Sequence, residues 1–146
     1  MTYEGIGNMC HIEGTMDKEL YKAILEDDLL GTIDYYGFDS SHVIFQHDND
    51  PKHTAKTVKE WLGEQDFNTL EWPASSPDLN PIEHLWAHLK MQLAKYDTPP
   101  KGMLELWERV EQEWNKISPD VCKNLIDSMP RRIEAVIKSK GWWTDY

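Results

Sequence analysis

The first candidate for chemistry is the carboxylate of Asp48, which ends an apolar run in the segment FQHDNDPKHTA (residues 45–55). In an open α/β sheet, functional groups lie beyond the carboxyl ends of the strands, and a carboxylate there needs water, donors or a cation as its partner. A structural explanation is also open, because Asn49, Asp50 and Pro51 favour an Asx turn. The segment therefore indicates either a functional strand end or a simple turn.

The second candidate is Glu83, in the segment SPDLNPIEHLW (residues 76–86). Asn80 is a good N-cap, Pro81 fits the first helical position, and Glu83 comes three residues after the cap, which predicts a capping box. Glu83 also lies at the edge of an apolar helical stripe, where its carboxylate could point along the sheet towards a strand end. A capping role and a catalytic role are both compatible with this position.

Asp48 and Glu83 together are compatible with a metal site. The 34 residues between them contain a predicted helix, strand and loop, which can return the chain to the same end of a sheet. Two carboxylates there would bind a hard divalent cation, and magnesium prefers few protein carboxylates together with water and phosphate oxygens. Two such ions could activate a nucleophile and stabilise the leaving oxygen in phosphodiester cleavage.

The elements that must position these side chains follow one another as strand, helix, strand, helix, strand and then helices. Strands are predicted at 2–12 (a short strand or hairpin), at 42–48 with both faces buried, and at 67–73. Helices are predicted at 17–37, 54–63 and 81–96, from 103 and 118 onwards, and at 130–140. This order predicts an α/β fold, a sheet layer with helical cover, and a C-terminal helical tail.

Composition and charge restrict the class of protein. The chain has 146 residues, 40% of them hydrophobic and 28% charged, which is typical of a globular domain. Its net charge is −11, and residues 1–50 carry eleven acidic but two basic side chains. Acidity of this size opposes non-specific DNA binding by the whole chain, because phosphates attract Lys and Arg. A role on nucleic acid must use a local site, a metal ion or a part not present here.

The motifs VIFQHDNDPKHTA and WPASSPDLNPIEHLW, at this spacing, closely resemble the DDE catalytic domain of mariner-type (Tc/mariner superfamily) transposases. The segments EGIGNMCHIEGTMDKELYKAIL and MPRRIEAVIKSKG resemble the same family, so the resemblance covers nearly the whole chain. It implies a ribonuclease-H-like α/β fold, a mixed sheet flanked by helices, which would lack its first strands here. Residues 1–100 would be the partial ribonuclease-H-like domain, and residues 101–146 its C-terminal helical extension.

The resemblance also implies roles for individual residues. Asp48 matches the second catalytic acidic residue and Glu83 the third, and both would hold magnesium or manganese. The other motif positions, which are expected to shape the site, are Asn49, His53, Pro77, Asp78, Asn80 and Pro81. No residue can be assigned to the first catalytic Asp, which lies on the first strand of the family's sheet. Asp50 stands where many relatives have a small residue, and it adds negative charge near the expected metals.

The activity that the resemblance implies is metal-dependent DNA strand cleavage and strand transfer, with transposon ends as the DNA partner. Without a first Asp, we expect the chain to be inactive or nearly so alone, as a truncated or remnant transposase. It could form a homodimer or pair with a full-length transposase. No signal peptide and no apolar run near the ~20 residues of a membrane span are visible, so we expect a nuclear or cytoplasmic protein that is not secreted and has no membrane partner.

Other interpretations remain open. The chain could be a non-catalytic interaction module that associates through an exposed sheet edge or its helical tail, or an incomplete gene product. His84 and His88, four residues apart on one helix, could chelate zinc, but HLWAH lacks the Glu of HExxH and no cysteine cluster supports such a site. Surface or packing roles are expected for these histidines. The basic residues of the tail are expected on a solvated helix face: Arg131, Arg132, Lys138 and Lys140.

Overall fold

The computed structural model describes residues 1–142 and 144, so residues 143, 145 and 146 of the predicted helical extension lie outside the described residues. The chain divides into two compact units. Residues 7–75 form one, called the N-terminal unit below, and residues 1–6 with 76–146 form the other, called the C-terminal unit. The predicted division at residue 100 falls within the C-terminal unit and stays a prediction.

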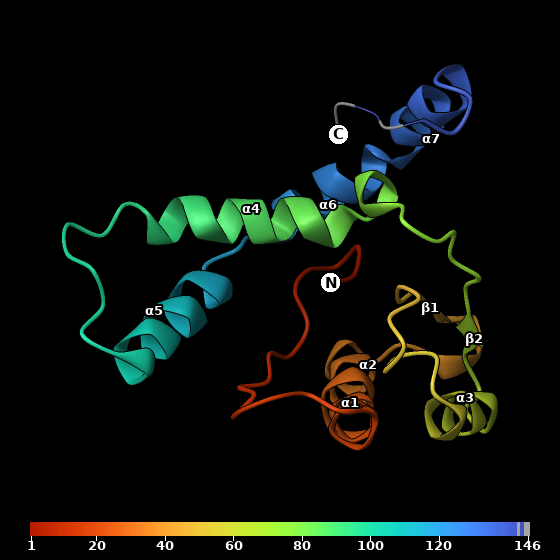
Figure 1. Ribbon diagram of the computed structural model, residues 1–146, viewed down its shortest axis with the longest axis horizontal. Coiled ribbons are helices and arrows are strands. Elements are labelled where there is room, and N and C mark those ends of the chain that lie inside the picture. The colour runs from red at the N-terminus through yellow and green to blue at the C-terminus, as the bar shows by residue number, and fades with distance from the viewer. Residues whose placement is uncertain (143, 145–146) are drawn as a thin grey trace. The chain divides into compact units, whose positions relative to one another are not determined.

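The helix predicted at 17–37 is present in the N-terminal unit as three consecutive helical segments (Figure 1). These are α1 (Lys18–Ile24), a π-helical turn (Leu25–Leu29) and α2 (Leu30–Tyr36). Asp17 caps the start, where its carboxylate accepts a hydrogen bond of 2.8 Å from the Leu20 N–H. Gly37 ends the helix in the left-handed conformation, with φ 64°, as its sequence position predicts.

The sheet of the N-terminal unit consists of two short parallel strands joined through a helix. Strand β1 (Ile44–Phe45) pairs with β2 (Asn68–Thr69), and α3 (Lys56–Gly63) forms the connection between them. The predicted order of strand, helix and strand is therefore confirmed, but both strands are shorter than predicted. Ile44 is 66% exposed, so the prediction that the first of them is buried on both faces is wrong. Successive side chains of a strand point to opposite faces, and here the face of Phe45 packs against the core while the face of Ile44 is left uncovered.

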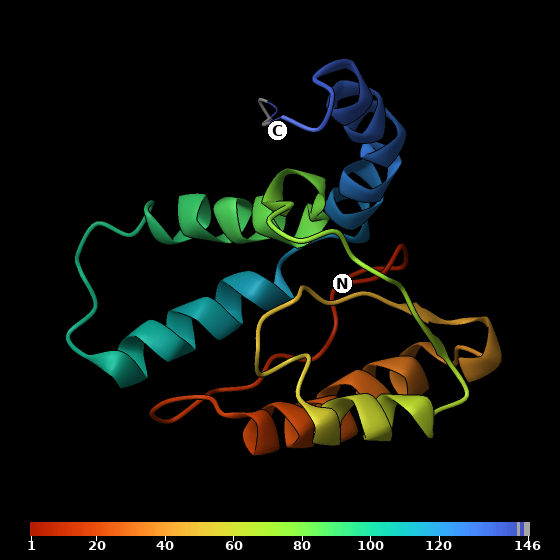
Figure 2. The ribbon, with the colours of Figure 1, turned by 45° about the vertical axis from the view of Figure 1, so that its right-hand side comes forward.

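The core of the N-terminal unit forms where α3 packs against α1, and Figure 2 shows the two helices side by side. Val58, Trp61 and Leu62, which the sequence places on the inner face of α3, are all buried. They belong to one apolar cluster with four further buried side chains, Tyr21, Leu25, Ile33 and Phe67. This cluster holds the strand ends, and hence the loop that carries Asp48, against the helices.

Residues 2–12, predicted as a short strand or hairpin, contain a tight antiparallel turn at residues 2–5 but no longer strand. Thr2 and Gly5 make a single antiparallel bridge across a tight turn, with Thr2 N–H donating to the Gly5 carbonyl at 2.7 Å. Gly5 has φ 146°, a backbone conformation that favours glycine, which explains why the chain turns here rather than continuing as a strand. Residues 6–12 have no regular secondary structure.

The described part of the C-terminal unit contains four α-helices in the predicted order. They are α4 (Pro81–Leu93), α5 (Met103–Asn115), α6 (Pro119–Asp127) and α7 (Met129–Lys138). Helices α5 and α6 both contact α4, and Figures 1 and 2 show α5 running alongside it. Helix α7 contacts the 3-10 turn Pro77–Leu79, which directly precedes α4. Helices α5, α6 and α7 therefore pack against α4 or the turn before it, the segment that contains Glu83.

The apolar stripe of α4 points into this helical unit. Leu85 and Leu89 are buried, together with Trp114, Ile117 and Cys122. Trp86, which the sequence places on the same stripe, is instead 36% exposed and stacks on Trp114 with ring centroids 5.3 Å apart. None of the helices described here has the length and apolar character that a membrane crossing requires.

Candidate active site

Asp48 follows β1 and makes the Asx turn that the sequence allows. Its Oδ1 atom accepts a hydrogen bond of 3.1 Å from the Asp50 N–H and one of 2.6 Å from Nδ1 of His53. Both bonds use the same carboxylate oxygen, and no bond to Oδ2 is present within the described N-terminal unit. Since the side chain is 57% exposed, Oδ2 can still meet water or a cation. The turn and a ligand role are therefore compatible, because they use different oxygens.

The ring of His53 is held in place by stacking on an aromatic side chain. The His53 ring lies on the ring of Tyr21 from α1, with centroids 3.9 Å apart and planes 26° apart. Because an ionised carboxylate only accepts, the His53 proton resides on Nδ1. The other ring nitrogen, Nε2, is buried and has no hydrogen-bond partner in the described structure. The bond to Asp48 is therefore the one hydrogen bond of the His53 side chain in the described structure.

The Tyr21 hydroxyl holds the neighbouring His47 in a complementary state. Burial, and then the charges of Asp48 and Asp50, raise the pKa of the Tyr21 phenol above its usual value, so the hydroxyl stays protonated. It donates to Nδ1 of His47 at 3.1 Å. Burial, and then the nearby His53, lower the pKa of His47, which favours the neutral ring that can accept this bond. One helix therefore orders both imidazoles beside the candidate carboxylate.

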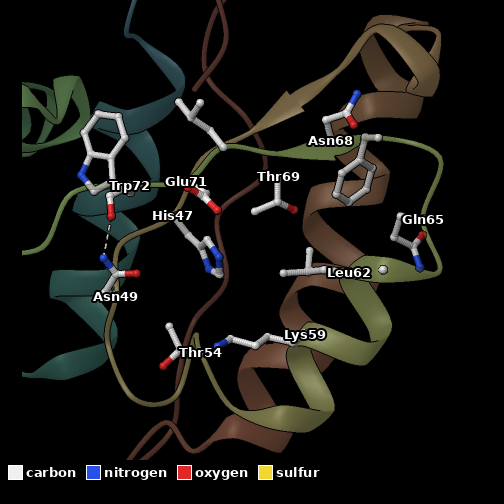
Figure 3. A pocket seen from close by; sticks show the side chains of 13 residues that line it. His47, Asn49, Thr54, Lys59, Leu62, Gln65, Asn68, Thr69, Glu71 and Trp72 are labelled. Carbon is white, nitrogen blue, oxygen red and sulfur yellow. Dashed lines mark hydrogen bonds between the residues drawn. The ribbon is translucent and has the colours of Figure 1, made fainter.

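Asn49 ties the loop after β1 to the segment after β2. Its amide donates to the Trp72 carbonyl at 2.7 Å (Figure 3). The two segments border an open groove of about 590 Å³, into which His47 and Lys59 project. Asp48 is not among the residues that line this groove. Asn49 therefore shapes the strand ends, while the groove lies beside the candidate carboxylate rather than around it.

Asp50, expected to add negative charge at the site, is neutralised locally. Its carboxylate accepts hydrogen bonds from the Lys52 side chain and from the Lys52 N–H, both at 2.9 Å. The Lys52 side-chain bond, followed by the backbone bond, lowers the pKa of Asp50 below its ordinary value. The extra acid is thus held ionised in a pair with a lysine two residues away, and its charge is largely compensated.

Glu83 lies in the first turn of α4, and the predicted capping box does not form. Asn80 is the N-cap, as predicted, and its side-chain oxygen accepts from the Ile82 N–H at 3.3 Å. In a capping box, Glu83 would accept from the Asn80 N–H, but that group donates to the Pro77 carbonyl at 3.0 Å. Glu83 is exposed, and within the described C-terminal unit its carboxylate has no capping role. The structural explanation for this residue is therefore wrong.

Asp78 and His84, on either side of Glu83, share a buried partner that the sequence did not predict. Arg132 of α7 donates from Nη1 to the Asp78 carbonyl at 2.9 Å and to Nδ1 of His84 at 3.1 Å. It is 2% exposed, so its placement on a solvated helix face is wrong. The Asp78 carboxylate is itself almost buried and accepts from the Thr144 hydroxyl at 2.8 Å. Asp78 thus fixes the turn before α4.

The two histidines of α4 are engaged in packing contacts. Arg132 can only donate, so Nδ1 of His84 is the acceptor and carries no proton. Burial, and then the Arg132 charge, lower the pKa of His84, which agrees with a neutral ring. His88 approaches the Gln92 amide at 3.4 Å. Across residues 1–142 and 144, no group of three His, Cys, Asp or Glu side chains is arranged to hold a metal ion.

The residues present still suit a hard divalent cation as individual donors. Asp48 offers a solvent-facing oxygen whose geometry is fixed through its other oxygen, and Glu83 offers an exposed carboxylate at a helix start. Carboxylate oxygens are the ligands that magnesium and manganese prefer, and neither residue presents a sulfur or an imidazole that would favour zinc. Asp48 belongs to the N-terminal unit and Glu83 to the C-terminal unit.

Sequence reasoning missed Tyr21 and Arg132. Helical spacing alone assigns Tyr21 no polar role, and the basic run around Arg132 predicts a solvated helix face. The available signal was weak. A Tyr on the buried stripe of a helix needs a partner for its hydroxyl, and of two adjacent arginines on an amphipathic helix, one falls on the inner face.

Comparison with known proteins identifies relatives over nearly the whole chain. The family model of the DDE superfamily endonucleases matches residues 1–101. The chain is 38% identical to the transposable element Tcb1 transposase of Caenorhabditis briggsae, over 97% of this chain and 50% of that protein. It is also 38% identical to the transposable element Tc1 transposase of Caenorhabditis elegans, over 99% of this chain and 52% of that protein. The chain therefore spans about half the length of these curated relatives.

Solved structures give the same result for the fold. The structure of the Mos1 transposase catalytic domain with raltegravir and Mg superposes with a TM-score of 0.78 and 26% identity, over 90% of this chain and 67% of that chain. The Mos1 paired end complex with Mg superposes with a TM-score of 0.86 and 24% identity, over 98% of this chain and 42% of that chain. The fold is thus that of the Mos1 catalytic domain, a ribonuclease-H-like α/β fold, as predicted.

Proposed function

The chain belongs to the DDE superfamily endonucleases, and we propose that it supplies two metal-binding carboxylates, Asp48 and Glu83, to the cleavage and joining of DNA strands in transposition. The observation that carries this proposal is the way Asp48 is held. One oxygen is fixed by His53 and the turn, while the other has no hydrogen-bond partner in the described N-terminal unit and belongs to a side chain that is 57% exposed, just after β1. A carboxylate that served the turn alone would not need a stacked histidine.

Magnesium or manganese would be held by Asp48 and Glu83. Such an ion, when bound, makes a nucleophilic oxygen more reactive and stabilises charge on a leaving oxygen. The chain's own residues perform the positioning. His53 fixes the Asp48 rotamer, Asn49 ties its loop to Trp72, and Asn80 begins the helix that presents Glu83. Asp78 holds the turn before that helix.

In this proposal, two segments of the chain have different roles. Residues 1–100 would be part of the catalytic domain, and residues 101–146 its helical extension. Asp48 and Glu83 are two of three acidic residues in the family's motif, and no residue from 1 to 146 matches the first. We therefore expect these 146 residues alone to cleave DNA slowly or not at all. The DNA partner would be transposon ends, and the protein would be nuclear or cytoplasmic.

A second candidate function is that of an interaction module, which the open edge of β1 favours. Among the described residues, β1 pairs with one strand, β2. An unpaired strand edge is a ready site for pairing with another chain. The module would pair with a second copy or with a longer transposase. Tight self-association that does not respond to magnesium or manganese would favour this function over catalysis.

Nicking of supercoiled plasmid by the purified protein, with magnesium or manganese, tests the enzymatic proposal. The variants are Asp48→Asn and Glu83→Gln, and Asp50→Asn is the matched control because its carboxylate is paired with Lys52. Any nicking should disappear in the first two variants and persist in the control. Nicking that persists in all three would contradict the assignment of the site. No nicking by a folded wild-type chain agrees with the proposed need for a third acidic residue.

A further inference from the structure

The side chain of Arg132 is the largest in the described structure that is almost completely buried. It lies on α7 and is 2% exposed, whereas its neighbour Arg131 is exposed. A guanidinium stays charged at any ordinary pH, so burying one is costly unless its donors are satisfied in good geometry. A residue retained at such a cost needs an explanation beyond the packing of a surface helix.

Two of the three hydrogen bonds described for Arg132 reach one short segment of the chain, residues 78–84. Its Nε donates to the Ser128 hydroxyl at 2.7 Å, which orients the guanidinium from its own end of α7. Its Nη1 donates to the Asp78 carbonyl and to Nδ1 of His84. These two acceptors lie 54 and 48 residues away in sequence, and they bracket Glu83. One side chain therefore clamps both ends of the segment that presents the candidate ligand.

The backbone between these two points has little freedom left. The Asn80 N–H donates to the Pro77 carbonyl, and the Glu83 N–H donates to the Asn80 carbonyl at 3.2 Å. Because successive residues of an α-helix are rotated by about 100°, fixing His84 fixes the direction in which the Glu83 side chain leaves the helix. Groups that hold a ligand from behind are what keeps a functional carboxylate in its productive geometry.

We propose that Arg132 is a positioning residue for Glu83, acting through the Asp78 carbonyl and the His84 ring. This role deepens the function proposed above and rests on it, because it assumes that Glu83 binds the metal ion. The basic tail segment then has two parts. Arg131 and the lysines near the helix end are exposed, while Arg132 belongs to the site.

Hydrogen exchange of metal-free protein tests the positioning directly. In Arg132→Gln, the amides of residues 79–84 should exchange about tenfold faster, while those of α5 in the same unit stay within about twofold of wild type. Arg132→Lys, which keeps the positive charge and one donor nitrogen, should restore part of the protection. Arg131→Gln is the matched control and should change neither region. Equal acceleration in both regions, or none in residues 79–84, would overturn the proposal.

A milder variant covers the case in which Arg132→Gln does not fold. Ser128→Ala removes only the hydroxyl that orients the guanidinium, and it should accelerate exchange in residues 79–84 alone. Its matched control is Ser139→Ala, which loses a hydroxyl at the other end of α7 whose bonds to described residues go to the Val136 and Trp142 carbonyls. Acceleration by both serine variants alike, or by neither, would count against the role of Arg132.

Manganese binding, followed by electron paramagnetic resonance, links the clamp to the site. Outer-shell partners of a metal ligand typically contribute about 10- to 100-fold to affinity, and we expect a loss in this range for folded Arg132→Gln. Arg131→Gln should bind like wild type. If wild type binds no manganese, the proposed function fails, while the exchange result still decides whether Arg132 orders the Glu83 segment. If wild type binds and Arg132→Gln binds equally well, the positioning role fails alone.

Discussion

The His53 ring donates a hydrogen bond of 2.6 Å to the Asp48 carboxylate five residues earlier in the chain. The bond joins the end of β1 to the segment that enters α3, and the stack on Tyr21 holds the ring in place. Of the two carboxylate oxygens, it occupies the one that the turn already uses. The arrangement fixes the side chain without covering the oxygen that faces solvent.

This relationship predicts that His53 sets the affinity for metal. His53→Ala should weaken manganese binding by about tenfold, because Asp48 loses the contact that orders it. His53→Asn should retain most of the affinity, since an Asn amide can take the place of Nδ1. Titration calorimetry would measure both variants. Comparable binding by His53→Ala and by His42→Ala, a variant of an exposed histidine elsewhere in the unit, would contradict the prediction.

A second prediction separates the N-cap of α4 from Glu83. Asn80→Ala should lower the free energy of unfolding by about 1 kcal/mol, because the Ile82 N–H loses its acceptor. Glu83→Ala should change it by less than about 0.5 kcal/mol, since this exposed residue takes no part in the cap. Urea unfolding, followed by tryptophan fluorescence, would show both effects. If Glu83→Ala lowered the free energy of unfolding as much as Asn80→Ala, the result would indicate that Glu83 does take part in a capping box.

A third prediction concerns the core beneath Glu83. Leu85 is completely buried on the inner face of α4. Leu85→Ala should destabilise the C-terminal unit by about 2–5 kcal/mol, through lost burial and the cavity left behind. Met91→Ala, on the exposed face of the same helix, should stay within about 0.5 kcal/mol of wild type. Thermal unfolding would compare them, and an equal effect of the two substitutions would contradict the packing described for α4.

The fourth prediction is a loss of stability in acid that depends on Glu113. Hydrogen bonds from the Lys116 side chain and then the Tyr96 hydroxyl lower the pKa of Glu113 from its ordinary value of 4.5. A carboxyl group whose pKa is lower in the folded state stabilises the fold above its unfolded pKa. That contribution is lost as the pH falls below about 4.5 and through the folded pKa.

Urea unfolding of Glu113→Gln and wild type between pH 3 and pH 6 would measure this contribution. Wild type should be the more stable protein at pH 6, and the difference should shrink towards pH 3. Glu111→Gln, which alters an exposed carboxylate on the same helix, should show no such trend. A constant difference across the range would mean that the Glu113 charge contributes nothing.

Much of the fold follows from local signals in the sequence. The helix from Asp17 to Gly37 was predictable because its cap, its apolar spacing and its glycine stop all lie within one segment. The same holds for α3 and α4. The strands were harder, because an apolar run predicts burial only if neighbours cover both faces, and Ile44 is left exposed. Which faces of a strand other elements cover is not a local property of the sequence.

The candidate site shows the same division between local and distant information. The Asx turn at Asp48 and the Asn80 cap use partners two residues away, and both were predictable. The clamp of Arg132 on Asp78 joins residues 54 positions apart, so composition indicated only a basic helix face. The capping box fails for a local reason instead, because the 3-10 turn before α4 takes up the Asn80 N–H that Glu83 would have bonded.

The proposed function requires both Asp48 and Glu83 as ligands of a divalent ion. Its most direct test is manganese binding, measured by electron paramagnetic resonance on wild type, Asp48→Asn, Glu83→Gln and the double variant. If the two carboxylates share an ion, each single substitution should weaken binding strongly, and the double variant should bind little worse than either single one. Binding that survives both single substitutions, or losses that simply add, would contradict a shared site.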